Sequence, residues 1–118
     1  MIIGVPSEVE ADEYRVAITP AGARELVAAD HTIILEAGAG EGSRLSDAAY
    51  ESQGVRIVDD EAELFAESQL IVKVKDPSEE EISRLRQKQA IFSFLHLAPQ
   101  VAIVTNLEPG AVLFIDEI

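Results

Sequence analysis

Two lysines lie in a short apolar run where folding alone does not call for charge. The run spans residues 70–77, with Lys73 and Lys75 among β-branched residues and Pro77 at its end. This composition predicts a β-strand that the proline stops. Side chains alternate along a strand, so Ile71, Lys73 and Lys75 are expected on one face, with the core on the other. Ligands bind beyond the carboxyl ends of strands in open α/β sheets, so Lys75 is expected to meet one. The alternative is that both lysines only reach solvent.

Arg15 and His96 add two groups of complementary chemistry. The planar guanidinium of Arg15 suits a carboxylate, and histidine exchanges protons near neutral pH. His96 follows the apolar run 90–95, which reads as a strand, although a histidine in such a place is more often structural. In a parallel sheet Lys75 and His96 both leave carboxyl ends of strands, with Arg15 beside them. The three groups suit a small oxo or amino acid, but their spacing does not show that they meet.

The elements that must position these groups alternate between strand and helix. Thr19, Ser46 and Ser78 are expected helix N-caps, with Glu81 completing a capping box. Repeated strand-helix units predict an α/β fold, a three-layer, mostly parallel sheet flanked by helices. The expected strands are 2–5, 15–18, 32–36, 55–58, 70–74, 90–95 and 111–115, and the expected helices are 20–29, 46–53, 60–68, 78–88 and 100–107.

The glycine-rich segment 37–45 is not expected to cradle a phosphate. Its glycines are Gly38, Gly40 and Gly42, whereas a G-x-G-x-x-G motif would require glycine in place of Ser43. The segment instead reads as a connector that uses positive φ.

Composition indicates one globular domain over residues 1–118. With 118 residues, 47% of them hydrophobic, the chain has enough apolar material for a core. A net charge of −13 disfavours nucleic-acid and anionic-membrane partners. Cysteine is absent, and neither a signal peptide nor a membrane-spanning run is evident. We therefore expect a cytoplasmic domain without a metal site.

Four ordered motifs resemble the amino-terminal domain of the alanine dehydrogenase and pyridine-nucleotide transhydrogenase family. They cover nearly the whole chain and look more like alanine dehydrogenase. The resemblance implies a flavodoxin-like or dehydrogenase catalytic-domain-like sheet. The motifs are EYRVAITPAG at 13–22, EAGAGEGS at 36–43, VKVKDP at 72–77 and FLHLA at 94–98.

The resemblance also implies roles for the three polar residues. Arg15 would bind the substrate carboxylate, and Lys75 would hold and polarise the pyruvate carbonyl or the amino group of L-alanine. His96 would assist proton transfer, so Lys75 and His96 are the expected catalytic residues. In such enzymes NAD takes the hydride from the α-carbon, which gives an imine that hydrolyses to pyruvate and ammonia.

The chain departs from the family pattern in three places. Ser7 stands where the family usually has a basic residue, the tail 99–118 drifts, and no G-x-G-x-x-G motif is present. The NAD-binding Rossmann domain and its acidic catalytic residue therefore have no counterpart here. We expect the substrate-binding half of an alanine dehydrogenase, inactive alone and without NAD of its own. A homo-oligomer, or a partner that supplies an NAD domain, stays open.

Two other kinds of function remain consistent with the sequence. The chain is alternatively a stand-alone module that binds a small carboxylate or docks on a partner without redox chemistry. It is also consistent with a domain fragment of a transhydrogenase or of a saccharopine-forming enzyme, or with a remnant that only oligomerises.

Overall fold

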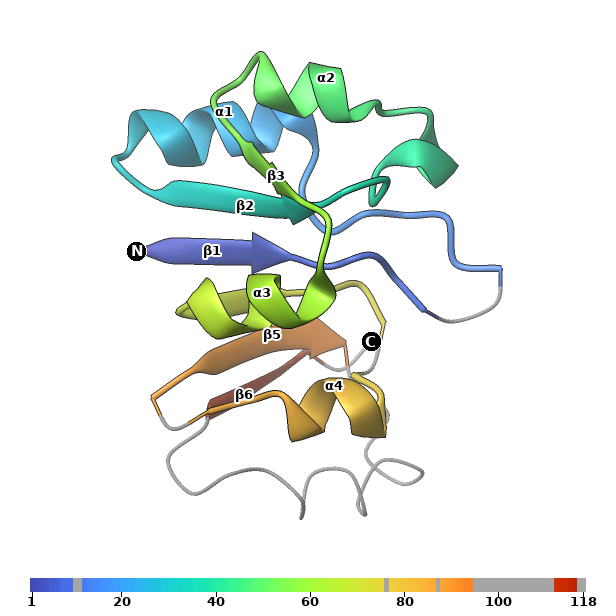
Figure 1. Cartoon of the computed structure of the whole chain (residues 1–118), viewed down its shortest axis with the longest axis vertical. Coiled ribbons are helices and arrows are strands. Elements are labelled where there is room, and N and C mark those ends of the chain that lie inside the picture. Colours follow the sequence, from blue (N-terminus) through green and yellow to red (C-terminus); the bar gives the residue numbers. More distant parts are fainter. Residues whose placement is uncertain (10–11, 76, 87, 95–111, 117–118) are drawn as a thin grey trace.

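The fold is built on a sheet in which every described strand runs parallel to its neighbours (Figure 1). The computed structural model describes residues 1–9, 12–75, 77–86, 88–94 and 112–116. Within them the strand order is β3-β2-β1-β4-β5-β6. This is the classic strand order of doubly wound sheets, and the flavodoxin-like order 2-1-3-4-5 is the other common order of the same class. The strands are β1 (Ile2–Val5), β2 (Thr32–Glu36), β3 (Arg56–Val58), β4 (Leu70–Val72), β5 (Ala90–Phe94) and β6 (Val112–Asp116).

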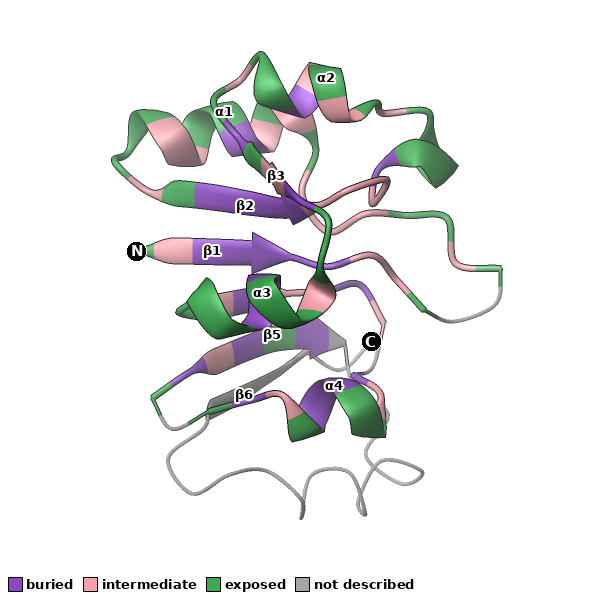
Figure 2. Ribbon diagram, in the orientation of Figure 1, coloured by how far each residue is buried: buried purple, intermediate pink, exposed green. Residues whose placement is uncertain are grey.

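Helices cover both faces of the sheet, which confirms the expected three-layer α/β fold (Figure 2). The helices are α1 (Pro20–Ala28), α2 (Asp47–Glu51), α3 (Glu61–Glu67) and α4 (Glu79–Ser83), with a short 3₁₀ turn η1 (Glu41–Ser43). Ile34 belongs to the core beneath α3 and α4, whereas Ile33 and Leu35 belong to the core beneath α1 and α2. Buried β-branched strands of this kind are typical of parallel sheets with two covered faces.

The helix starts follow the predicted capping residues. Thr19 accepts a hydrogen bond from the Gly22 N–H at 3.1 Å, and Ser46 accepts one from the Ala49 N–H at 3.2 Å. Helix α4 carries a complete capping box between Ser78 and Glu81. These local bonds pair backbone donors that a helix start leaves free, so the sequence pattern fixes where each helix begins.

Three expected elements differ from the structure. The helix expected at 78–88 is shorter, since α4 ends at Ser83. Residues 15–18 form a loop rather than a strand, and the Tyr50 hydroxyl satisfies the Ile18 carbonyl by donating to it at 2.7 Å. Strand β4 ends at Val72, and both of its faces are apolar because Ile71 packs in one core and Leu70 and Val72 in the other. Lys73 and Lys75 therefore follow the strand instead of sharing its face with Ile71.

The helix expected at 100–107 lies outside the described residues. None of the helices that are described is long and apolar enough to cross a membrane.

Gly4 lets α3 pack closely on the central strand. A Cβ at this position would lie 2.0 Å from the Ser68 Oγ and 2.9 Å from the Leu64 Cδ2. Both neighbours are fully buried, so neither has free space to move into. We expect Gly4→Ala to lower the free energy of unfolding by about 1–3 kcal/mol, the usual cost of overpacking a core. Urea denaturation followed by circular dichroism measures this value.

Gly22→Ala is the matched control for this substitution. A Cβ at Gly22 meets only ordinary contacts, at 3.4 Å from the Thr19 Oγ1 and 3.5 Å from the Ile18 Cγ2. Because Gly22 lies in helix α1, alanine is expected to raise stability by up to about 1 kcal/mol. Equal effects of the two substitutions would show that α3 does not pack on β1 as described.

Candidate functional site

The candidate site lies where the strand order reverses, between β1 and β4. The chain builds one side of the sheet from β1 to β3 and then returns to place β4 beside β1. Segments that follow the two strands therefore leave the same edge of the sheet and diverge there (Figure 1). Such a point is where open α/β sheets bind ligands. Glu8, Glu13 and Arg15 come from the segment after β1, and Lys73 and Lys75 from the segment after β4.

Arg15 is held by the carboxylate of Glu13, two residues before it. The Glu13 Oε2 accepts hydrogen bonds from the backbone N–H and the Nε–H of Arg15, and Oε1 accepts one from Nη2 at 2.8 Å. The Glu13 side chain is 4% exposed and that of Arg15 is 67% exposed. Within the described residues Nη1 of Arg15 makes no hydrogen bond. The guanidinium is thus fixed along one edge and presents the other to solvent.

Lys75, from the segment after β4, lies near the same Glu13 carboxylate. Its Nζ lies 3.9 Å from the Glu13 Oε1, and its side chain is 40% exposed. Glu13 therefore brings together Arg15 and Lys75, two of the three residues predicted from the sequence. The exposed Arg15 guanidinium and the partly exposed Lys75 ammonium therefore lie beside one carboxylate, in a chain whose net charge is −13.

The hydrogen bonds from Arg15 lower the pKa of Glu13 from 4.5 to about 2. Because the folded-state pKa is depressed, the ionised pair stabilises the fold above pH 4.5, and this contribution is lost as the pH falls towards 2. In Arg15→Gln we expect the pKa of Glu13 to return towards its ordinary value. Carboxyl ¹³C NMR between about pH 3.5 and 6 should show Glu13 titrating only in the variant. The same titration curve in both proteins would mean that the guanidinium does not hold Glu13.

Lys73 does not lie on a shared face with Lys75, as the lysine run suggested. Its side chain is fully buried, with Nζ 3.2 Å from the Glu8 Oε1 and 3.3 Å from the Glu81 Oε2. This corrects the expectation that Lys73 and Lys75 share one exposed face. The physical reason is that β4 ends at Val72, so the alternation of a strand no longer applies to residue 73.

His96, the third predicted residue, lies outside the described residues. Its proximity to Arg15 and Lys75 therefore stays a prediction. The strand before it, β5, is parallel to β4 and lies next to it, with Val72 opposite Phe92. The chain therefore leaves β5 at the same edge of the sheet as the other two residues.

Two acidic residues of β2 and α3, Glu36 and Glu61, lie near enough to Glu81 for its charge to act on both. Burial raises the pKa of Glu36, and the hydrogen bond from the Ser7 N–H partly offsets this. Burial likewise raises the pKa of Glu61, whose carboxylate lies 3.4 Å from the Arg84 Nη1.

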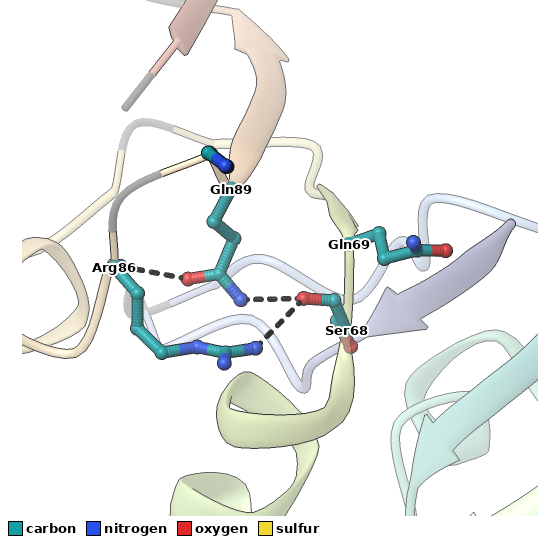
Figure 3. A pocket seen from close by; sticks show the side chains of 5 residues that line it. Ser68, Gln69, Arg86 and Gln89 are labelled. Carbon is teal, nitrogen blue, oxygen red and sulfur yellow. Dashed lines mark hydrogen bonds between the residues drawn. The ribbon is translucent and has the colours of Figure 1, made fainter. Parts of the chain in front are cut away.

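A polar pocket at the opposite edge of the sheet has a different role. It is lined by Ser68, Gln69, Arg86, Lys88 and Gln89, which lie at the amino ends of β4 and β5 (Figure 3). The buried Gln89 amide donates to the Ser68 carbonyl at 2.7 Å and accepts from the Arg86 N–H at 3.0 Å. These bonds tie the end of α3 to the start of β5, so the pocket reads as a structural junction.

The chain is thus an α/β domain whose parallel sheet carries the cations Arg15 and Lys75 at its switch point. Residues 4–116 match the family described as alanine dehydrogenase/PNT, N-terminal domain. The chain therefore belongs to this family.

Individual relatives agree with the assignment. Alanine dehydrogenase from Halomonas elongata is 48% identical over 107 residues, which cover 91% of this chain and 29% of that protein. A solved L-alanine dehydrogenase superimposes with a TM-score of 0.88 at 33% identity, covering 95% of this chain and 31% of its own. A transhydrogenase from Sinorhizobium meliloti gives 0.89 at 28% identity, covering 98% and 34%. The chain thus spans about 29% of the length of the curated relative.

Sequence reasoning missed the two carboxylates that organise the site, Glu8 and Glu13. With 22 acidic residues in the chain, neither stands out by type. The available signal was position, because both lie in the polar loop that leads from β1 to Arg15.

Proposed function

We propose that this chain is the substrate-binding part of an NAD-dependent alanine dehydrogenase, which converts L-alanine to pyruvate and ammonia. The observation that carries the proposal is the convergence of Arg15 and Lys75 on the Glu13 carboxylate at the switch point of the sheet. Family membership supports the choice of substrate, since the matched relatives are alanine dehydrogenases.

In this proposal Arg15 holds the substrate carboxylate through its free edge, where charge-assisted hydrogen bonds are strong. The Lys75 ammonium donates a hydrogen bond to the oxo oxygen of pyruvate, which makes the carbonyl carbon more electrophilic towards ammonia. In the reverse direction Lys75 contacts the amino group of alanine. His96 exchanges the proton at that centre.

The family implies NAD, but the described residues do not fit its pyrophosphate. The amides of the glycine-rich segment are used within the fold: the Gly38 N–H donates to the Asp47 carboxylate at 2.9 Å, and the Glu41 N–H donates to the Gly38 carbonyl. The carboxylates of Glu41 and Asp47 would also repel a phosphate. We therefore propose that NAD is held by residues other than those described here.

Titration of the ¹⁵N-labelled chain with pyruvate tests the proposal. Saturable shifts are expected at the Lys75 amide and the Arg15 Nε–H. Propionate is the matched control, because it has the same carboxylate and carbon number without the oxo group, and we expect it to shift Arg15 more than Lys75. No saturable shift with pyruvate overturns the proposal. Equal affinity for both acids supports the second candidate, a module that binds carboxylates without redox chemistry.

A further inference from the structure

A second ionic cluster lies beneath the candidate site and is shielded from solvent. It consists of Glu8, Lys73 and Glu81, whose side chains are 2%, 0% and 1% exposed. Bringing such groups out of water is costly, and apolar residues of the same volume often give equal or greater stability. Packing alone therefore does not explain why charged residues occupy this place.

Glu8 has further partners in the segment that carries Lys75. Its Oε2 accepts the Val74 N–H at 3.0 Å, and its Oε1 accepts the Lys75 N–H at 3.0 Å. The Lys73 N–H donates to the Phe92 carbonyl at 2.9 Å, which anchors the backbone of Lys73 to β5. Three successive backbone amides after β4 are thus fixed, two of them by one carboxylate.

Lys73 and Glu81 hold that carboxylate in place. The Lys73 ammonium lies between the Glu8 and Glu81 carboxylates, and the Glu81 Oε1 accepts the Ser78 N–H in the capping box of α4. The cluster consequently joins the segment after β1, the segment after β4 and the first turn of α4. An apolar substitute of equal volume would fill the space but would leave the amides of Val74 and Lys75 without an acceptor.

We infer that Glu8 is a positioning residue for Lys75, and that Lys73 is the buried cation that holds the Glu8 carboxylate in this place. Glu8 sets where the backbone of residue 75 lies and so sets the reach of its ammonium towards Glu13 and the ligand. The inference deepens the proposed function. Only its statement that Lys75 contacts an oxo acid rests on that function. The positioning of the backbone stands independently of the ligand.

The first test uses the unaltered chain. Scalar couplings across hydrogen bonds are measured by NMR from the amide nitrogens of Val74 and Lys75 to the carboxyl carbon of Glu8. We expect both couplings. If neither is present, the inference is overturned, and this result requires no variant to fold.

The second test is Glu8→Gln, with Glu80→Gln as the matched control. Glu80 is an exposed carboxylate on α4 that pairs with Arg84. In Glu8→Gln we expect hydrogen exchange at the Val74 and Lys75 amides to accelerate at least about tenfold, and pyruvate to bind at least about tenfold more weakly, the loss expected for one hydrogen bond to a charged group. In Glu8→Gln the exchange rates of the β2 amides should stay within about twofold of those in the unaltered chain. In Glu80→Gln both the exchange rates and the affinity for pyruvate should stay within the same limit.

The two readouts separate the inference from the proposed function. Unchanged exchange at Val74 and Lys75 overturns the inference, whatever happens to pyruvate. A general rise in exchange that includes β2 also overturns it, since Glu8 would then serve overall stability alone. Absence of pyruvate binding to the unaltered chain overturns the proposed function, while accelerated exchange in Glu8→Gln still supports the positioning of Lys75.

Discussion

Replacement of Lys73 by methionine is expected to lower the free energy of unfolding by about 3–5 kcal/mol. Methionine retains much of the volume of lysine but removes the only cation within 4 Å of the buried Glu8 and Glu81 carboxylates among the described residues. Two like charges would then face each other out of contact with water. The Glu81 Oε2 has no hydrogen bond even in the native arrangement, so it depends wholly on the Lys73 charge. Chemical denaturation at neutral pH measures the change.

Lys75→Met is the control for this effect. It makes the same chemical change two residues further along, at a side chain that is 40% exposed and 3.9 Å from its carboxylate partner. Partly solvated pairs contribute little, so the expected loss is below about 1 kcal/mol. Similar losses for the two lysines would contradict the burial of Lys73. In that case the strand alternation that the sequence predicts for this run would be the better description.

Arg15→Gln is expected to weaken pyruvate binding at least about tenfold, the second large effect. Glutamine removes the positive charge that the ligand carboxylate would meet and also releases Glu13, which then competes for Lys75. The Arg15 side chain is mostly exposed, so the fold should be retained. Isothermal titration calorimetry with pyruvate measures the affinity, and the circular dichroism spectrum checks the fold.

Arg24→Gln provides the comparison. Arg24 is an exposed residue within α1, so its replacement removes the same unit of charge from the molecule without touching the switch point. The affinity of the Arg24→Gln variant for pyruvate should differ from that of the unaltered chain by less than about twofold, since exposed charges at a distance are screened by salt. If Arg24→Gln and Arg15→Gln weaken binding equally, then net charge, and not the guanidinium beside Glu13, attracts the ligand.

Much of the fold could be predicted because its determinants are local. Helix starts follow from Thr19, Ser46 and Ser78, whose side chains pair backbone donors within three residues. The strands follow from short apolar runs between turns, and a repeated strand-helix order allows few topologies. The order of the strands around β1 is a long-range property, and the sequence pattern left it open.

The site was harder to predict because its geometry depends on residues far apart in the chain. Glu8 and Lys73 are separated by 65 positions, and no local pattern indicates that they pair. The pattern of the lysine run was also misleading, since it continued the strand beyond Val72. Position and side-chain chemistry indicated Arg15 and Lys75, and the family resemblance implied their roles, but the role of Glu13 as their shared partner became visible only from the structure.

A crystal structure of this chain with pyruvate bound is the most direct test of the central claim, that Glu13 assembles Arg15 and Lys75 into an oxo-acid site. The account predicts that the pyruvate carboxylate lies against the free edge of the Arg15 guanidinium, with the oxo oxygen within hydrogen-bond distance of the Lys75 Nζ. Pyruvate bound elsewhere, for example beside Arg86 at the opposite edge of the sheet, would contradict it.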